Sequence, residues 1–256
     1  MNRIDAAFDA LKTAGRKGLV GYLTAGDPDL VQSERDIRTA LDGGVDVLEL
    51  GVPFSDPTAD GPTIQAAAHR ALAGGMTVRK VLEMVARLRE DYTQPIVLFG
   101  YANPFFRYGY DALCADAAGA GADGLLVVDL PFEEADELRG HAAANGLCFV
   151  PLIAPTTAAT RMTDVLADAS GFVYYIMVTG VTGARDVLVG DLQERLRALR
   201  AATALPLAVG FGVSNGAQAR EAAANADAVV VGSAFVRAAR EGRLEAMVRE
   251  IADALH

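Results

Sequence analysis

The sequence predicts a single β/α barrel with one extra helix before its first strand. Short apolar segments rich in strand-forming residues alternate with longer amphipathic segments along the whole chain. The apolar segments are continuous, a pattern typical of parallel strands that are covered on both faces. The 256 residues hold eight such strand–helix units, which is the number in a closed barrel of this kind. We therefore expect one domain, (β/α)8 in architecture, over residues 1–256.

The expected elements follow one another without a linker. The strands are expected at Leu19–Ala25, Val45–Val52, Ile96–Tyr101, Gly124–Asp129, Cys148–Ile153, Phe172–Val178, Leu207–Phe211 and Ala228–Gly232. Helical spacing is clearest at Val78–Glu90, Glu133–Asn145, Asp191–Ala201 and Gly216–Asn225, and the extra helix is expected at Ile4–Ala14. Thr179–Gly190, after the sixth strand, is rich in Gly and Val and has no helical period, which predicts a mobile lid or a disordered connection.

An open, doubly wound sheet is the alternative fold. It is disfavoured because no Gly-x-Gly-x-x-Gly motif follows the first strand, where the chain reads Thr24–Pro28. A weak repeat supports the barrel: Gly44–Leu48, Gly121–Leu125 and Asn225–Val229 each end a helix with Gly or Asn and open a strand through an Asp. These aspartates fall at strand amino ends, where a barrel is stabilised rather than catalytic.

Charge and composition exclude several classes of protein. The formal net charge is −10, which argues against nucleic acid or an anionic membrane as partner. No apolar run approaches the ~18 residues of a membrane span, and the first residues lack the apolar core of a signal peptide. Cys114 and Cys148 have no metal-ligand spacing and are expected to be buried small hydrophobes. A cytoplasmic location is the default expectation.

Glu49 is the strongest catalytic candidate. It shares one expected strand face with Val45, Val47 and Gly51, so its carboxyl should point into the apolar mouth of the barrel. Burial disfavours the charged form, and the pKa should rise towards the range that suits proton transfer. The alternative is a structural carboxylate paired with a helix cation, but no basic residue lies nearby in the sequence.

Asp60 is the second candidate. It ends the loop after the second strand, and three prolines stiffen the segment Pro53–Pro62. Because Pro62 and Thr63 resemble a helix start, Asp60 could equally be the N-cap of that helix. Spacing alone does not decide between a cap and a catalytic carboxylate.

Three glycine-rich loops predict a site for a phosphate group. They are Gly180–Gly183, Gly210–Asn215 and Gly232–Ala234, after the sixth, seventh and eighth strands. Glycine lets main-chain N–H groups approach an anion, and this fold commonly binds phosphate at the last two of these loops. The alternative is that the glycines only make tight turns. None of the three histidines falls at the expected catalytic end, and no ligand set for a metal is present in the sequence, so histidine and metal chemistry are not expected.

The segment Glu49-Leu-Gly-Val-Pro-Phe-Ser-Asp-Pro-Thr-Ala-Asp-Gly-Pro-Thr-Ile-Gln65 resembles the signature of the tryptophan synthase α subunit family. The resemblance runs from about residue 3 to the end of the chain and continues at Tyr22–Pro28, Tyr101–Pro104, Asp129–Pro131, Gly180–Gly183, Gly210–Ser214 and Gly232–Ser233. It implies a lyase of tryptophan biosynthesis that cleaves indole-3-glycerol phosphate to indole and glyceraldehyde 3-phosphate.

The resemblance also implies a role for each matching residue. Glu49 would be the general acid/base, Asp60 would hold the indole N–H, and Tyr174 would support the same site. Phosphate would be bound by Gly183, Gly212, Gly232 and Ser233. The indole pocket and lid would be formed by Tyr22, Phe99, Val128, Leu152, Phe211 and Thr182. The chain departs from the family pattern at Tyr22, where Phe is usual, and at Val178-Thr179, where many members have a polar pair that anchors the lid.

No cofactor is expected in this chain. The resemblance implies a β subunit as partner, in an αββα tetramer, which carries pyridoxal phosphate and takes up the indole. Pro53–Asp60 and the loop Asn103–Tyr108, with Phe105, Phe106 and Tyr108, are candidate contacts, although one or two of these aromatics could instead be core residues. The alternatives are another phosphate-binding barrel enzyme, a stand-alone indole-releasing lyase, and a regulatory subunit without activity.

Overall fold

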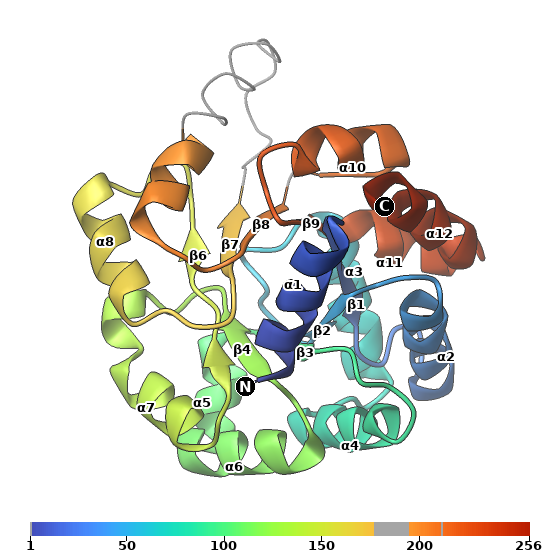
Figure 1. The fold of residues 1–256 in the computed structure, drawn as a ribbon. Helices are drawn as coiled ribbons and strands as arrows, with labels where there is room; N and C mark the ends of the chain where they lie inside the picture. Colours follow the sequence, from blue (N-terminus) through green and yellow to red (C-terminus); the bar gives the residue numbers. More distant parts are fainter. Residues whose placement is uncertain (1, 177–194, 211) are drawn as a thin grey trace.

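The computed structural model describes residues 2–176, 195–210 and 212–256 as strands surrounded by helices (Figure 1). The strands are β1 Gly18–Thr24, β2 Val47–Gly51, β3 Ile96–Gly100, β4 Gly124–Val127, β5 Cys148–Phe149, β6 Leu152–Ile153, β7 Val173–Ile176, β8 Leu207–Gly210 and β9 Ala228–Val231. The helices are α1 Arg3–Ala14, α2 Leu30–Asp42, α3 Pro62–Ala73, α4 Val78–Arg89, α5 Ala102–Tyr108, α6 Tyr110–Ala120, the 3-10 turn η1 Phe132–Glu134, α7 Asp136–Ala144, α8 Ala159–Ala167, α10 Gly216–Ala223, α11 Ser233–Arg240 and α12 Leu244–Leu255.

The strands form one parallel sheet that closes on itself. Its order is β5-β4-β3-β2-β1-β9-β8-β7-β6, and the two ends of this order are halves of the single expected strand Cys148–Ile153. Val150 N–H donates to the Leu125 carbonyl and Tyr174 N–H donates to the Pro151 carbonyl, each at 2.9 Å, so this segment joins β4 to β7. Pro151 has no N–H to donate, which accounts for the break between the halves. The predicted barrel is confirmed.

The expected helices differ from the observed ones mainly in their ends. The segment expected as one helix at Glu133–Asn145 is divided into η1 and α7 by Ala135, whose φ and ψ of −90° and 4° are not helical. Residues 195–202 are helical, and the first part of the expected helix Asp191–Ala201 lies outside the described residues, as does the expected lid Thr179–Gly190.

The barrel interior is filled by side chains from alternate strand positions, and α1 covers its amino-terminal end (Figure 1). Ile4, Phe8 and Leu11 of α1 belong to this inner cluster, and the Phe8 ring lies 5.6 Å from that of Phe172. Val45 belongs instead to the outer cluster that packs against the helices. The expectation that Val45 shares the face of Glu49 is therefore wrong, because Val45 precedes β2, where strict alternation has not begun.

The three repeated aspartates tie neighbouring strands together at the amino end of the barrel. Asp46 accepts a hydrogen bond from Leu19 N–H at 2.8 Å, and Asp123 accepts one from Ile96 N–H at 2.8 Å. Asp227 likewise accepts a hydrogen bond of 2.7 Å from the N–H of Leu207, the first residue of β8. Each carboxylate thus satisfies a backbone donor at the start of a strand, which agrees with the structural role expected for them.

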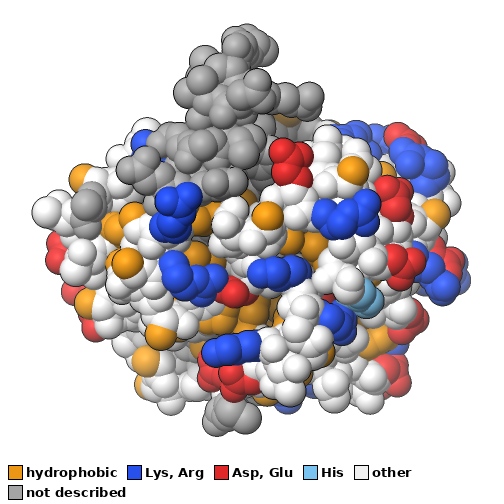
Figure 2. All heavy atoms as spheres, turned by 45° about the horizontal axis from the view of Figure 1, so that its top comes forward, with side chains coloured by type: hydrophobic (Ala, Val, Ile, Leu, Met, Phe, Trp, Pro, Cys, Tyr) orange, Lys and Arg blue, Asp and Glu red, His pale blue; other side chains and the backbone are white. Residues whose placement is uncertain are grey.

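Basic side chains also gather at this end of the molecule. Figure 2 shows Lys and Arg side chains around a hollow that contains apolar side chains. A groove of about 600 Å³ lies here, with the cations Lys12, Arg16, Lys17 and Arg200 in its lining. Arg16 lies 3.6 Å from Asp46 and Arg200 lies 2.5 Å from Asp227, so both are paired with carboxylates. Among the helices that the structure describes, none has the length and apolar character needed to cross a bilayer.

Candidate functional site

Glu49 lies inside the barrel on β2, two residues before the end of this strand. Its strand neighbours are Tyr22 of β1 and Val97 of β3. The side chain has no exposed surface, and neither carboxyl oxygen has a hydrogen-bond partner in the described part of the chain. Burial raises the pKa of Glu49 to about 8, as the sequence led us to expect. Much of the carboxyl is therefore protonated at neutral pH.

The buried Glu49 carboxyl lowers the stability of the folded state, because a polar group that is buried without partners loses its hydration and forms no hydrogen bond in exchange. A structural carboxylate would be paired with a cation, and no ion pair of Glu49 exists among the described residues. Groups of this kind are typical of catalytic sites, where an unusual pKa is needed. The structural alternative for Glu49 is therefore disfavoured.

Asp60 ends the loop between β2 and α3. Helix α3 begins at Pro62 with Gly61 as its N-cap, and no side chain caps it. The helix-cap alternative for Asp60 is therefore wrong. Its Oδ2 instead accepts a hydrogen bond of 2.9 Å from the Tyr101 hydroxyl. Burial raises the pKa of Asp60, and this hydrogen bond lowers it.

The loop that carries Asp60 is held from two sides. Tyr101, which follows β3, accepts a hydrogen bond of 3.1 Å from Ala59 N–H. From α3, Gln65 donates to the Asp60 carbonyl at 2.8 Å, and His69 Nε2 lies 3.1 Å from the Ser55 carbonyl. Sequence reasoning did not single out Tyr101 as a site residue. Its position as the last residue of an expected strand, at the catalytic end, is the signal that could have identified it.

Two further tyrosines lie close to both carboxyls. Burial is the main cause that raises the pKa of the Tyr22 and Tyr174 phenols, and the charges of Asp60 and Glu49 add to it. Tyr22 is 5% exposed, and its ring meets that of Phe99 edge-on at 5.1 Å. Side chains from β1, β2, β3, β7 and the β2–α3 loop thus meet at one end of the barrel.

Gly51 makes room for Tyr22. A Cβ atom on Gly51 would lie 2.2 Å from the Tyr22 hydroxyl oxygen, too close for any real contact. We expect Gly51→Ala to displace this ring and to lower the free energy of unfolding by about 1–3 kcal/mol, the usual cost of overpacking. Denaturant unfolding measures the change.

Gly119→Ala is the matched control for this substitution. Gly119 lies within α6, and nothing lies within 4 Å of the Cβ position. Alanine favours a helix, so this variant should gain stability by about 0.5–1 kcal/mol. Equal unfolding free energies for the two variants would show that the close approach of Tyr22 to Gly51 imposes no constraint.

Most of the residues expected to line an apolar pocket are described by the structure, and these lie in the same part of the barrel. Phe99, Val128, Leu152 and Tyr174 are partly buried and pack against the inner cluster of the barrel. Tyr22 forms a small cluster with Ile64, Ala67 and Val236, which Phe99 also contacts. The remaining expected members, Phe211 and Thr182, lie outside the described residues.

The two expected phosphate loops that the structure describes follow adjacent strands, β8 and β9. Gly212 has a φ of +66°, which favours glycine, and Gly232 is the N-cap of α11. No side chain caps α11, which begins at Ser233, so main-chain N–H groups of its first turn are left for another acceptor. A Cβ on Gly232 would meet only Tyr22 and Ile64, at 3.6 Å or more. Gly183 lies outside the described residues.

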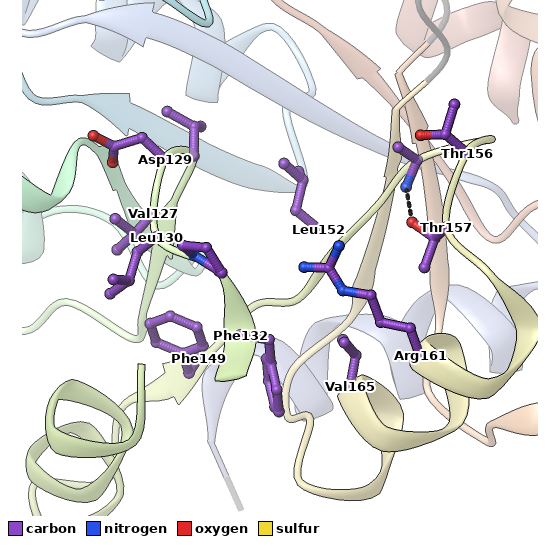
Figure 3. A pocket seen from close by; sticks show the side chains of 13 residues that line it. Val127, Asp129, Leu130, Phe132, Phe149, Leu152, Thr156, Thr157, Arg161 and Val165 are labelled. Atoms are coloured by element: carbon purple, nitrogen blue, oxygen red, sulfur yellow. Dashed lines mark hydrogen bonds between the residues drawn. The ribbon is translucent and has the colours of Figure 1, made fainter. Parts of the chain in front are cut away.

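A pocket of about 300 Å³ adjoins these residues but is not centred on the carboxylates. Val128 and Leu152 belong to its wall, and neither Glu49 nor Asp60 does. Figure 3 shows Arg161 reaching into it from α8, and Thr157 Oγ1 accepting a hydrogen bond from Ala154 N–H. The carboxylates therefore lie outside the wall of this pocket. In the ranges that the structure describes, no group of three or more His, Cys, Asp or Glu residues could hold a metal ion.

The segment expected as a contact loop at Asn103–Tyr108 is a helix, α5. Phe105 is fully buried, and a Cβ added to Gly100 would lie 2.7 Å from its ring, so for Phe105 the core alternative is confirmed and the exposed one is wrong. Phe106 is 67% exposed. Tyr108 is half-buried and donates a hydrogen bond of 2.6 Å to Asp116.

Comparison with known proteins gives a consistent result over the whole chain. A family model described as tryptophan synthase alpha chain matches residues 8–254. The tryptophan synthase alpha chain of Citrifermentans bemidjiense is 53% identical over 237 residues, which cover 93% of this chain and 89% of the relative. The tryptophan synthase alpha chain of Gluconacetobacter diazotrophicus is 53% identical over 256 residues, which cover 100% of this chain and 93% of that relative. The crystal structure of tryptophan synthase subunit alpha from Legionella pneumophila has a TM-score of 0.92 at 38% identity and covers 100% of this chain and 98% of its own.

Proposed function

The chain belongs to the tryptophan synthase alpha chain family, and we propose that Glu49 and Asp60 divide the work of its lyase reaction. The reaction cleaves indole-3-glycerol phosphate to indole and glyceraldehyde 3-phosphate, a step of tryptophan biosynthesis. The observation that carries the assignment is the buried Glu49 carboxyl, which has no partner and a pKa of about 8.

Glu49 is the general acid and base. In its neutral form it donates a proton to C3 of the indole ring, which leaves a positive charge on the ring nitrogen. The glycerol hydroxyl next to C3 then loses its proton to the Glu49 carboxylate, the C–C bond breaks, and its electron pair neutralises the ring. The aldehyde and indole leave, and Glu49 is again protonated. A carboxyl with a raised pKa suits both steps near neutral pH.

Asp60 stabilises the intermediate charge. An ionised carboxylate that accepts the indole N–H becomes a stronger partner when the ring turns positive, so it favours the transition state over the bound substrate. The Tyr101 hydrogen bond supports this ionised form. Tyr174, whose phenol lies near both carboxyls, completes the catalytic set by packing beside the reacting atoms.

The remaining residues hold the two ends of the substrate. Tyr22, Phe99, Val128 and Leu152 form the indole pocket, together with Phe211 and the lid residue Thr182. The phosphate binds the main chain at Gly183, Gly212 and Gly232 and the hydroxyl of Ser233. Glycine at position 232 supports this assignment. The protein leaves space for a side chain there, so packing does not require a glycine, whereas the close approach of a bound phosphate to the main chain does.

The partner is a tryptophan synthase β subunit, in an αββα tetramer located in the cytoplasm. Exposed residues of the loop Pro53–Asp60 and the exposed ring of Phe106 are the proposed contact surface. The two parts are connected, since the Phe54 ring of the loop packs at 5.3 Å from that of Tyr101, which precedes α5. The β subunit carries pyridoxal phosphate, and this chain forms one domain without a cofactor.

Indole release tests the catalytic and the partner assignments together. The purified chain is expected to release indole from indole-3-glycerol phosphate, and a cognate β subunit is expected to raise this rate by ordering the contact surface. Phe106→Ser should keep the rate of the isolated chain and weaken the gain from the β subunit. The absence of indole in both mixtures would contradict the lyase function, whereas a rate unaffected by the β subunit would favour a stand-alone lyase.

A further inference from the structure

Tyr101 is the one side chain in the described ranges that donates a hydrogen bond to the Asp60 carboxylate. The residue follows β3 at the catalytic end of the barrel and is 2% exposed. Its ring packs on Phe54, at 5.3 Å between ring centres. The ring is thus fixed by packing, and its hydroxyl is the only polar atom that it brings into this region.

The Tyr101 hydroxyl accepts one hydrogen bond and donates another. Ala59 N–H donates to the Tyr101 oxygen at 3.1 Å, and the hydroxyl donates to Oδ2 of Asp60 at 2.9 Å. An oxygen that accepts one hydrogen bond donates a stronger one, because each bond polarises the next. A phenol that points its proton at a carboxylate favours the charged state of that carboxylate over the neutral one.

Among the residues that the structure describes, no other side chain donates a hydrogen bond to the Asp60 carboxylate. The titratable groups that face it are Tyr101, which follows β3, Tyr22 from β1 and Tyr174 from β7, and Glu49 from β2 lies beside the same two tyrosines, Tyr22 and Tyr174. Burial raises the pKa of Asp60, and no cation forms an ion pair with it among the described residues. Glu49 is mostly protonated at neutral pH, so it adds little charge there.

We propose that Tyr101 is a positioning residue for Asp60, and that its hydroxyl fixes the carboxylate and keeps it ionised for the reaction. This inference rests on the role proposed above for Asp60. Tyr101 need not touch the substrate. It ties the carboxylate to strand β3 and, through Ala59 N–H, to the backbone of the same loop.

Tyr101→Phe removes the hydroxyl and keeps the ring. With indole-3-glycerol phosphate as substrate, we expect kcat to fall about tenfold, the effect of losing a hydrogen bond to a charged group, with a smaller change in KM. The acidic limb of the pH profile should move to higher pH, because without this bond Asp60 takes up a proton more readily. Tyr92→Phe is the matched control: it removes a hydroxyl that donates to Asp42 at 3.0 Å on the surface, and its profile should match that of the wild type.

A second variant covers the case in which Tyr101→Phe fails to fold. Site-specific 3-fluorotyrosine at position 101 keeps the ring and makes the hydroxyl a stronger donor, so the acidic limb should move to lower pH. Unchanged profiles in the folded Tyr101 variants, together with an Asp60→Asn variant that is inactive, would overturn the role of Tyr101 and leave that of Asp60 intact. An active Asp60→Asn variant would instead contradict the proposed function itself.

Discussion

Replacing Glu49 with Gln is expected to lower turnover of indole-3-glycerol phosphate by about 10²–10⁴-fold, the range for losing a general acid and base. The amide has nearly the same size and fills the same buried position, so substrate binding should change little. Steady-state indole release and the affinity for a substrate analogue measure the two effects separately. Glu134→Gln, the same change on the exposed turn η1, is the control. A Glu49→Gln variant with near-normal turnover would rule out the proton-transfer role.

The same substitution has a consequence for stability that depends on pH. The folded pKa of Glu49, about 8, lies above its ordinary value of 4.5, so the folded state binds the proton more tightly than the unfolded state. Stability linked to this proton is complete below the ordinary pKa and is lost as pH rises through the folded pKa. Gln does not titrate, so the variant should gain stability relative to the wild type over this interval. Unfolding by denaturant at several pH values measures the difference, and a constant difference would contradict the buried, unpaired state of the carboxyl.

Asp60→Asn is expected to lower turnover by about 10²–10³-fold, the usual effect of removing a group that stabilises transition-state charge. Asparagine keeps the shape of the side chain and one oxygen for the Tyr101 hydroxyl, but it has no charge to oppose the positive indole ring. The loss should therefore appear mainly in kcat. Single-turnover cleavage and equilibrium binding distinguish this outcome from simple loss of affinity.

Asp56→Asn is the matched control for this variant. Asp56 lies on the same loop, is exposed, and its carboxylate accepts a hydrogen bond of 2.5 Å from Ser55. In the isolated chain it should leave indole release unchanged. If both variants lost activity equally, the effect would belong to the loop and not to the Asp60 charge.

The sequence by itself determined the barrel and its strongest catalytic candidate. Continuous apolar strands alternate with amphipathic helices, and this pattern allows few folds because a strand buried on both faces needs helices around it. Glu49 could be identified because a carboxyl within such a strand has no structural reason to be there. The three repeated aspartates could likewise be assigned to strand starts, since their place in the repeat fixes the end of the barrel at which they lie. The single-domain organisation and the roles of the site residues stay predictions.

Only the tertiary structure decided which side chains meet. Local spacing left Asp60 undecided between a cap and a site residue, and the decision came from Gly61 at the helix start and from Tyr101, a partner 41 positions away along the chain. Phe105 and Phe106 are adjacent in sequence, yet one lies buried under Gly100 and the other is exposed. Periodicity predicts which face of an element is buried, but it carries no information about which residue of a distant strand lies opposite. That choice is made by packing across the closed barrel, where every strand end is brought to the same rim.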